Sequence, residues 1–203
     1  MVETLEDKID FPYRPGLEKV PAAISKVCYL DGDIGALEYR GYRIEDLARN
    51  CSYEETAYLL MNADLPNAAQ LAEFDGALKA RRSLEPHILN LLKTLPPDGH
   101  PMQALAAAVA AMGMTHASVP FHDVAHPQHW QHRYDAAVGL IAELTTLVAA
   151  WHWIRQGKEP VAPRTDLSHS ANFLYMLTGQ VPDVDLVKVF DVCMVLHAEH
   201  EMN

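Results

Sequence analysis

Helical periodicity dominates the sequence from about residue 43 onward. Apolar residues recur at three- and four-residue spacing, and Gly, Pro or a capping residue separates one periodic segment from the next. Strand-type alternation nearly vanishes in this region. The pattern predicts an all-α fold of roughly eight helices. The expected helices lie at residues 43–50, from Ser52 to before Pro66, at 67–82, 86–95, 103–112, 134–156 and 171–177, and from Asp183 or Asp185 to the last residue.

The first forty residues carry different signals. Residues 1–16 are charged and contain proline, which predicts an arm without a core. Residues 27–39 predict a small β-hairpin, because Asp31-Gly32-Asp33 is a turn signal between two apolar segments. Further on, Ser52 followed by Glu55 forms a capping box and predicts a helix start. No interior linker is apparent, so residues 43–203 are expected to form one helical unit.

The charge balance limits the partners of the chain. Lys and Arg number 16 against 27 Asp and Glu, which gives a formal net charge of −11. Nucleic acid and anionic membrane surfaces both require clustered positive charge, so neither is expected as a partner. Apolar stretches are interrupted by His, Glu, Thr or Gly before they reach about 18 residues, so no membrane-spanning helix is expected either.

The cysteines and the start of the chain indicate a compartment. Cys28, Cys51 and Cys193 are too scattered for a disulfide framework or a zinc knuckle, which favours reduced thiols. The first sixteen residues contain no apolar stretch typical of a secretory signal. A cytoplasmic location is the expectation.

Two histidines near the end of the sequence form the first candidate site. His197 and His200 are three positions apart, so on a continuous helix both rings would project from nearly one face. That face would also carry Leu186, Val189, Phe190 and Cys193 as a buried stripe. Satisfied core histidines and a functional role are equally compatible with this pattern. A metal site is disfavoured because no third ligand lies at useful spacing, whereas a donor or cationic imidazole near a helix C-terminus suits an anionic ligand.

Residues 116–132 contain five histidines and form the second candidate site. Three of them, His126, His129 and His132, have spacings of three that would allow metal ligation on a helix. Pro120 and Pro127 argue against a continuous helix, and no cysteine accompanies the histidines. A solvated loop of unassigned role is therefore predicted, and no metal site.

The helices at 103–112 and 134–156 are rich in alanine. Small side chains such as Ala106, Ala107 and Ala110 permit close helix–helix approach. Ordinary packing within the chain explains this composition, and so does an interface between subunits.

Several short segments occur along nearly the whole chain. No single segment is distinctive, but their order and spacing taken together are highly specific. The segments are Gly16-Leu17-Glu18, Tyr29-Leu30-Asp31-Gly32, residues 37–47 and 53–60, Leu65-Pro66, His100-Pro101-Met102, Gly157-Lys158-Glu159-Pro160, and residues 172–177 and 196–203. In this order and spacing they resemble the citrate synthase family. The resemblance implies an all-α fold of a large and a small domain. Residues 1–203 would be the amino-terminal portion of the large domain, truncated before the small domain.

The resemblance also implies a reaction. Members of the family condense acetyl-CoA with oxaloacetate to citryl-CoA in the tricarboxylic acid cycle and hydrolyse it to citrate and CoA. They need no cofactor besides the acetyl-CoA substrate and work as homodimers, and the helices at 103–112 and 134–156 resemble those that pack across the dimer interface. His200 stands at the histidine of the family's Asp-His-Glu motif, with Glu199 replacing the aspartate, and would bind oxaloacetate; His197 is a secondary candidate.

The catalytic groups of the family cannot be mapped onto this chain. The aspartate base, the histidine that stabilises the enol, the histidine that polarises the oxaloacetate carbonyl and the carboxylate-binding arginines all lie downstream in the family. We therefore expect no catalytic residue within these 203 residues, and no turnover by them alone.

Three alternatives stay open from the sequence. The protein could belong to the 2-methylcitrate synthases of the same family, which use propionyl-CoA. It could be a non-catalytic subunit or paralogue that acts in assembly or regulation. An unrelated helical domain is the third reading.

Overall fold

The computed structural model describes residues 25–116 and 128–199, and over these residues the chain is mostly helical. The helices are α1 Ile44–Asn50, α2 Tyr53–Asn62, α3 Ala68–Ala80, α4 Pro86–Thr94, α5 Pro101–His116, α6 His129–Ile154, α7 His169–Thr178 and α8 Val184–Leu196. The predicted all-α class with a small amino-terminal hairpin is confirmed. The arm predicted at residues 1–16 lies outside the described residues.

A three-stranded antiparallel sheet precedes the helices. Its strands are β1 Cys28–Asp31, β2 Ala36–Tyr39 and β3 Tyr42–Arg43, in the order β1-β2-β3. The predicted hairpin is confirmed, and the Asp31 carboxylate stabilises its turn by accepting the Asp33 N–H at 3.0 Å. The short strand β3 was not predicted. It follows a tight turn in which Arg40 has a φ of 52° and Gly41 a φ of 86°.

Side-chain caps fix where several helices begin. At α2 the Ser52 hydroxyl accepts the Glu55 N–H at 3.2 Å, and the Glu55 carboxylate accepts the Ser52 N–H at 2.7 Å, which confirms the predicted capping box. Asn67 and Gln70 form a second capping box at the start of α3. Gly179, with a φ of 74°, ends α7 in the left-handed conformation that glycine adopts without strain.

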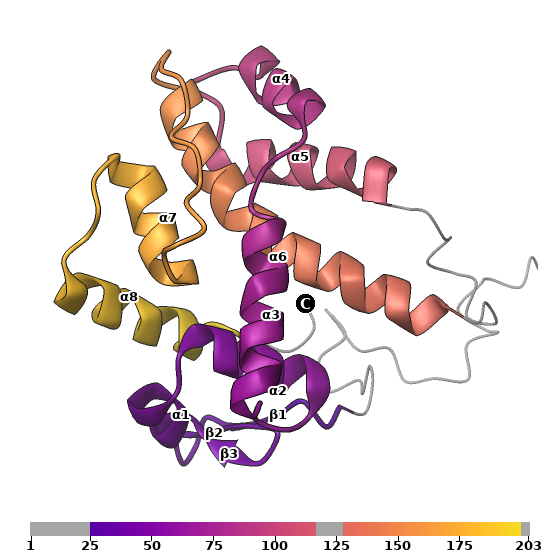
Figure 1. The fold of residues 1–203 in the computed structure, drawn as a ribbon, viewed down its shortest axis with the longest axis vertical. Helices are drawn as coiled ribbons and strands as arrows, with labels where there is room; N and C mark the ends of the chain where they lie inside the picture. Colours follow the sequence, from indigo (N-terminus) through magenta and orange to yellow (C-terminus); the bar gives the residue numbers. More distant parts are fainter. Residues whose placement is uncertain (1–24, 117–127, 200–203) are drawn as a thin grey trace, which may run out of the picture.

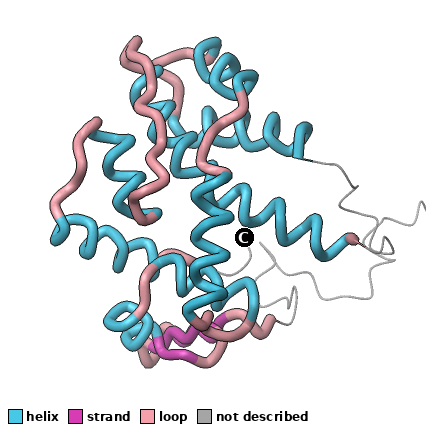
Figure 2. The backbone as a smooth tube through the Cα atoms, in the orientation of Figure 1, coloured by secondary structure: helices cyan, strands magenta, loops and turns pink. Residues whose placement is uncertain are grey.

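The helices pack around three apolar clusters of side chains. Figures 1 and 2 show how the helices are arranged. The sheet, α1 and α2 lie at one end, α4 and α5 lie at the other, and α3 runs between them (Figure 1). Helix α8 packs against α1, α2 and α7, while α6 contacts α3, α5 and α7. The buried members of the cluster at the sheet end are Tyr39, Ile44, Leu47, Leu59 and Val195.

Three helix boundaries differ from the sequence prediction. Helix α5 extends to His116, and α6 already begins at His129 instead of Tyr134, because no residue that breaks a helix follows Pro127. Two histidines of the predicted loop, His129 and His132, therefore lie in the first turn of α6. Helix α8 ends at Leu196 instead of continuing to the end of the sequence.

The 26-residue helix α6 is long and apolar enough to cross a membrane by length and composition alone. Its apolar residues are interrupted, as expected, by Gly139, Glu143 and His152, so α6 meets this criterion through its average composition. Half of its most apolar window is buried inside the protein. Packing against α3, α5 and α7 accounts for this apolar composition, since a central core helix passes the same test.

Candidate functional site

The first candidate site lies where α8 ends. His197 is the C-terminal cap residue of α8, with a φ of −112°, and its side chain is exposed. Its Nδ1 atom lies 2.7 Å from the carbonyl oxygen of Cys193. Since a carbonyl oxygen only accepts hydrogen bonds, Nδ1 is the donor in this bond. His200, the principal candidate, lies outside the described residues.

The end of α8 is held by a buried tyrosine of the sheet. Tyr39 on β2 is 0% exposed, and its hydroxyl oxygen lies 3.3 Å from the carbonyl oxygen of Leu196 and 3.2 Å from that of Glu199. The Glu199 N–H donates to the same hydroxyl at 3.4 Å. Sequence reasoning missed this contact because nothing in the pattern links β2 to residues about 160 positions later.

Two carboxylates, one on α8 and one on α2, bind donors at the starts of α2 and α7. Asp191 on α8 accepts the Tyr53 N–H at 3.0 Å through Oδ2 and the Ser170 hydroxyl at 2.5 Å through Oδ1. Glu54 on α2 accepts the His169 N–H at 2.7 Å. Both carboxylates satisfy N–H or O–H donors at helix N-termini, where negative charge is favoured. These bonds set the position of α8 relative to its neighbours.

The apolar stripe predicted on α8 is not buried. Leu186 is 51% exposed and Val189 is 63% exposed, and Cys193 is exposed as well. Phe190 instead stacks on Phe173 of α7, with ring centroids 5.3 Å apart. Of the four predicted members only Phe190 packs against a neighbouring helix, so the prediction of a buried face was wrong for Leu186, Val189 and Cys193. His197 is exposed as well.

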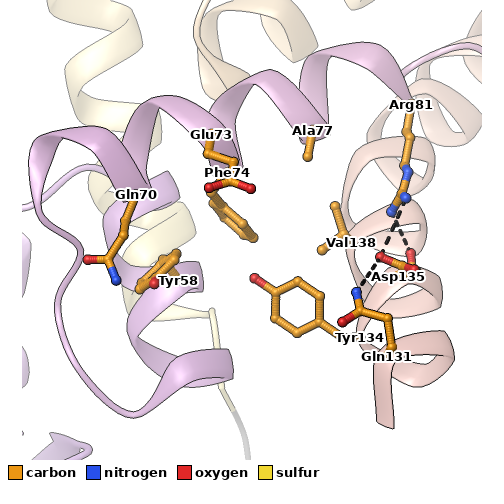
Figure 3. A pocket seen from close by; sticks show the side chains of 10 residues that line it. All are labelled: Tyr58, Gln70, Glu73, Phe74, Ala77, Arg81, Gln131, Tyr134, Asp135 and Val138. Carbon is orange, nitrogen blue, oxygen red and sulfur yellow. Dashed lines mark hydrogen bonds and ion pairs between the residues drawn. The ribbon is translucent and has the colours of Figure 1, made fainter. Parts of the chain in front are cut away.

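A pocket of about 240 Å³ lies between α2, α3 and the start of α6 (Figure 3). Aromatic rings of Tyr58, Phe74 and Tyr134 face its interior, and Arg81 lies at one end (Figure 3). The Arg81 guanidinium donates to the main-chain oxygen of Asp135 at 2.7 Å and lies 3.6 Å from its carboxylate. Arg81 and Asp135 pair with each other, and Glu73 also lines the pocket, so its wall is both polar and apolar.

Two further cavities have different linings. One, of about 450 Å³, is a groove beside α2 and α3 that Glu54, Asp75 and Lys79 line; the other, of about 120 Å³, is apolar and lies between α4, α5 and α6. His197 lines none of these three cavities.

The first residue of α7, His169, has a buried imidazole ring. His169 is 1% exposed and stacks on Tyr53, with ring centroids 5.1 Å apart. Neither of its ring nitrogens has a hydrogen-bonding partner within the part of the chain that is described. Burial, together with the nearby Arg82 charge, lowers the pKa of His169 to about 4, and Asp75 opposes this shift. The ring is therefore neutral at pH 7, and it was not among the predicted site residues.

The histidine-rich segment shows no ligand set in its described portion. His122 and His126 lie outside the described residues. His129 is 2% exposed, its Nε2 lies 3.4 Å from Arg133, and it packs edge-on against Trp130 at 5.4 Å. Within residues 25–116 and 128–199, no three His, Cys, Asp or Glu side chains are grouped so that they could hold a metal ion.

Comparison with known proteins relates the whole chain to one family. Residues 16–203 match the sequence model described as "Citrate synthase, C-terminal domain". The citrate synthase of Synechocystis sp. is 45% identical over 191 residues, which are 94% of this chain and 47% of that protein. The 2-methylcitrate synthase of Mycobacterium tuberculosis is 34% identical over 98% of this chain and 48% of that protein.

Solved structures with a similar fold belong to the same family. A crystal structure of citrate synthase from Pyrobaculum aerophilum superposes with a TM-score of 0.81 at 36% identity, over 92% of this chain and 47% of that one. The chain thus spans about half the length of the curated relatives and solved structures that it matches.

Proposed function

Because the chain belongs to the citrate synthase family, we propose that the protein containing it condenses acetyl-CoA with oxaloacetate to citrate and CoA. The match over residues 16–203 carries this proposal. The proposal places the activity in the whole protein, with a cytoplasmic location and no cofactor. In this scheme the chain contributes an oxaloacetate-binding histidine and the helices of a dimer interface.

His200 is the proposed oxaloacetate ligand. Oxaloacetate is a dianion, and an imidazole N–H or imidazolium is a charge-assisted donor for its oxygens. The chain has a net charge of −11, so binding a dianion requires a local donor rather than the overall field. His197, exposed at the end of α8 with its Nδ1 already bonded to the chain, is the secondary candidate.

The bond-forming chemistry is proposed to come from groups outside these residues. The reaction joins the acetyl methyl carbon to the carbonyl carbon of oxaloacetate, and water then cleaves the thioester. The base and the two histidines that the family resemblance assigns to these steps have no counterpart in this chain. The printed 203 residues on their own should therefore release no CoA from acetyl-CoA and oxaloacetate.

A thiol-release assay on the whole protein tests the proposal. His200→Ala should raise the KM for oxaloacetate about 10- to 150-fold, because a hydrogen bond to a charged group contributes about 1.5–3 kcal/mol. His87→Ala, at an exposed histidine of α4, is the matched control and should leave the KM unchanged. Oxaloacetate binding without any thiol release would instead indicate a non-catalytic subunit.

The acyl-CoA specificity has a second candidate, because a 2-methylcitrate synthase is among the relatives at 34% identity. Propionyl-CoA differs from acetyl-CoA by one methylene, which a pocket discriminates by about 1–3 kcal/mol. We expect kcat/KM to favour acetyl-CoA by about 10- to 200-fold. A preference for propionyl-CoA would assign the protein to 2-methylcitrate synthesis.

The proposed homodimer uses the exposed face of α5. Small or unbranched side chains occupy one face at helical spacing and are exposed, namely Gln103, Ala106, Ala107, Ala110, Gly113 and Met114. Val148 of α6, which is 41% exposed, borders the neighbouring apolar cavity. Such a face suits close packing against a second copy.

Sedimentation of the whole protein tests this interface. Ala107→Glu should convert the dimer to monomer, since the new carboxylate would be buried between helices. Ala69→Glu, at an exposed alanine in the first turn of α3, should leave the dimer intact. A dimer that survives Ala107→Glu would place the interface elsewhere.

A further inference from the structure

The pocket between α2, α3 and the start of α6 is lined by residues that recur at helical spacing. On α3 the lining positions are 70, 73, 74 and 77, followed by Arg81 just after the helix, and on α6 they are 131, 134, 135 and 138. Positions three and four apart share one face of a helix, so α3 and α6 each present one face to this space. Tyr58 of α2 completes the wall (Figure 3).

Three aromatic rings belong to this wall. Tyr58 and Phe74 lie edge to face, with ring centroids 5.5 Å apart and ring planes at 86°. Tyr134 faces them from α6, and its hydroxyl accepts the Asn62 side-chain amide at 3.3 Å (Figure 3). Phe74 is 3% exposed and Val138 is 1% exposed, so core packing holds this wall in place. The face of an aromatic ring attracts a cation that lies within about 6 Å of the ring centroid.

The charged side chains of the lining sum to one negative charge. The Arg81 guanidinium donates to the main-chain oxygen of Asp135 and lies 3.6 Å from its carboxylate, and the Gln131 amide donates to the same carboxylate at 3.2 Å. Arg81 and Asp135 therefore compensate each other. The Glu73 carboxylate also lines the pocket, and none of the ion pairs formed within residues 25–116 and 128–199 includes it.

We propose that this pocket binds a small organic ammonium ion that carries an apolar group. The ammonium group lies between the Glu73 carboxylate and the aromatic rings, and the apolar group contacts Ala77 and Val138. An anion would be repelled by Glu73, and Arg81, the cation of the lining, already binds Asp135. The net charge of −11 adds to the attraction of cations.

Phenethylammonium is a suitable probe, because it joins a primary ammonium group to an apolar ring that a cavity of about 240 Å³ can admit. Titration of the whole protein, followed through the NMR signals of the probe, should give a dissociation constant on the order of 1 mM. Phenethyl alcohol keeps the ring and lacks the charge, and it should bind about tenfold more weakly. Phenylacetate, which reverses the charge, should bind more weakly still. These measurements need no turnover, so their outcome does not depend on the proposed function.

Two variants test whether the probe occupies this pocket. Glu73→Gln removes the charge and keeps the shape, and it should weaken binding about three- to fivefold, because an exposed carboxylate is partly screened by solvent. Ala77→Leu fills the pocket from α3 and should weaken binding at least about tenfold, since the added side chain occupies the space of the apolar group. Glu85→Gln is the matched control, at an exposed glutamate before α4 that lines none of the three cavities, and it should bind like the parent.

Circular dichroism shows that each variant is folded before its affinity is compared. Equal affinity for phenethyl alcohol and phenethylammonium would contradict the proposal, because the pocket would then bind the ring and not the cation. Tightest binding of phenylacetate would instead assign recognition of anions to Arg81. Unchanged affinity in Glu73→Gln would show that the carboxylate does not bind the ammonium group, and unchanged affinity in Ala77→Leu would place the probe outside this pocket. No saturable binding at millimolar probe would overturn the proposal as well.

Discussion

Replacing His169 with phenylalanine tests how much of the pH dependence of stability in this fold comes from one buried imidazole. The ring is 1% exposed and stacked on Tyr53, and its nitrogens have no partner in the described part of the chain. Phenylalanine has a similar shape and needs no hydrogen bonds. Exchanging an unpartnered polar ring for an apolar one should be neutral or slightly stabilising at about pH 7.5.

The sign of the effect follows from the two pKa values. Burial and the Arg82 charge lower the pKa of His169 from 6.5 in the unfolded chain to about 4 in the folded protein. Between these values the unfolded chain binds more protons, so stability increases with pH. The contribution is fully present above about pH 6.5, is lost as the pH falls through about 4, and amounts to about 3 kcal/mol in total, most of which is lost by about pH 4.5.

Urea unfolding followed by circular dichroism measures this contribution. The free energy of unfolding is compared between His169→Phe and the parent at about pH 7.5 and about pH 4.5. The variant should gain about 2–3 kcal/mol relative to the parent at the lower pH. The comparison cancels neighbours such as Glu54, whose pKa is raised by burial and whose effect therefore has the opposite sign.

His87→Phe on the surface of α4 is the control, and it should show no relative change between the two pH values. Parallel pH profiles for His169→Phe and the parent would refute the reasoning. They would mean that the imidazole is protonated or hydrogen-bonded in the folded protein.

Further substitutions should change the free energy of unfolding, as urea titration at neutral pH would measure. Ser52→Ala removes the cap of α2 and should destabilise by about 1 kcal/mol; no change would mean that the capping box adds nothing. Leu59→Ala empties a 0% exposed position and should destabilise by about 2–5 kcal/mol, unless neighbouring side chains fill the space. Asp191→Ala leaves the Tyr53 N–H and the Ser170 hydroxyl without their acceptor and should destabilise the protein by about 2–5 kcal/mol. Asp191→Asn should recover part of this stability. Lys93→Ala breaks an exposed ion pair with Glu159 and should change stability by less than about 0.5 kcal/mol; a larger loss would reveal a contribution beyond the surface pair.

Local chemistry made much of the fold predictable. The capping box at Ser52, the turn at Asp31 and the glycine that ends α7 act over a few residues, and all three are confirmed. The start of α6 was misplaced because six polar or aromatic residues lie between Pro127 and Tyr134, and such residues are compatible with a helix but give no periodic apolar signal. Strand β3, with two residues, is too short to leave a periodic signal.

Features that depend on distant contacts could not be predicted. Periodicity shows that α8 has an apolar face but not which neighbour covers it, and the expected burial of Leu186 and Val189 was wrong. The environment of His169 depends on Tyr53 of α2, which stacks on its ring, and on the charge of Arg82 in the connection after α3, both far from it in the sequence. The assignment of His200 to oxaloacetate stays a prediction, since that residue lies outside the described part of the chain.

The bond from Tyr39 to Leu196 joins residues 157 positions apart, which has a consequence for synthesis of the chain. A ribosome adding about 5–20 residues per second releases the sheet roughly 8–30 s before its partner exists. During that interval the strands have an open edge and an incomplete apolar contact, the combination that promotes pairing between nascent chains. We expect this end of the molecule to fold late and to be the region most dependent on chaperones while translation proceeds.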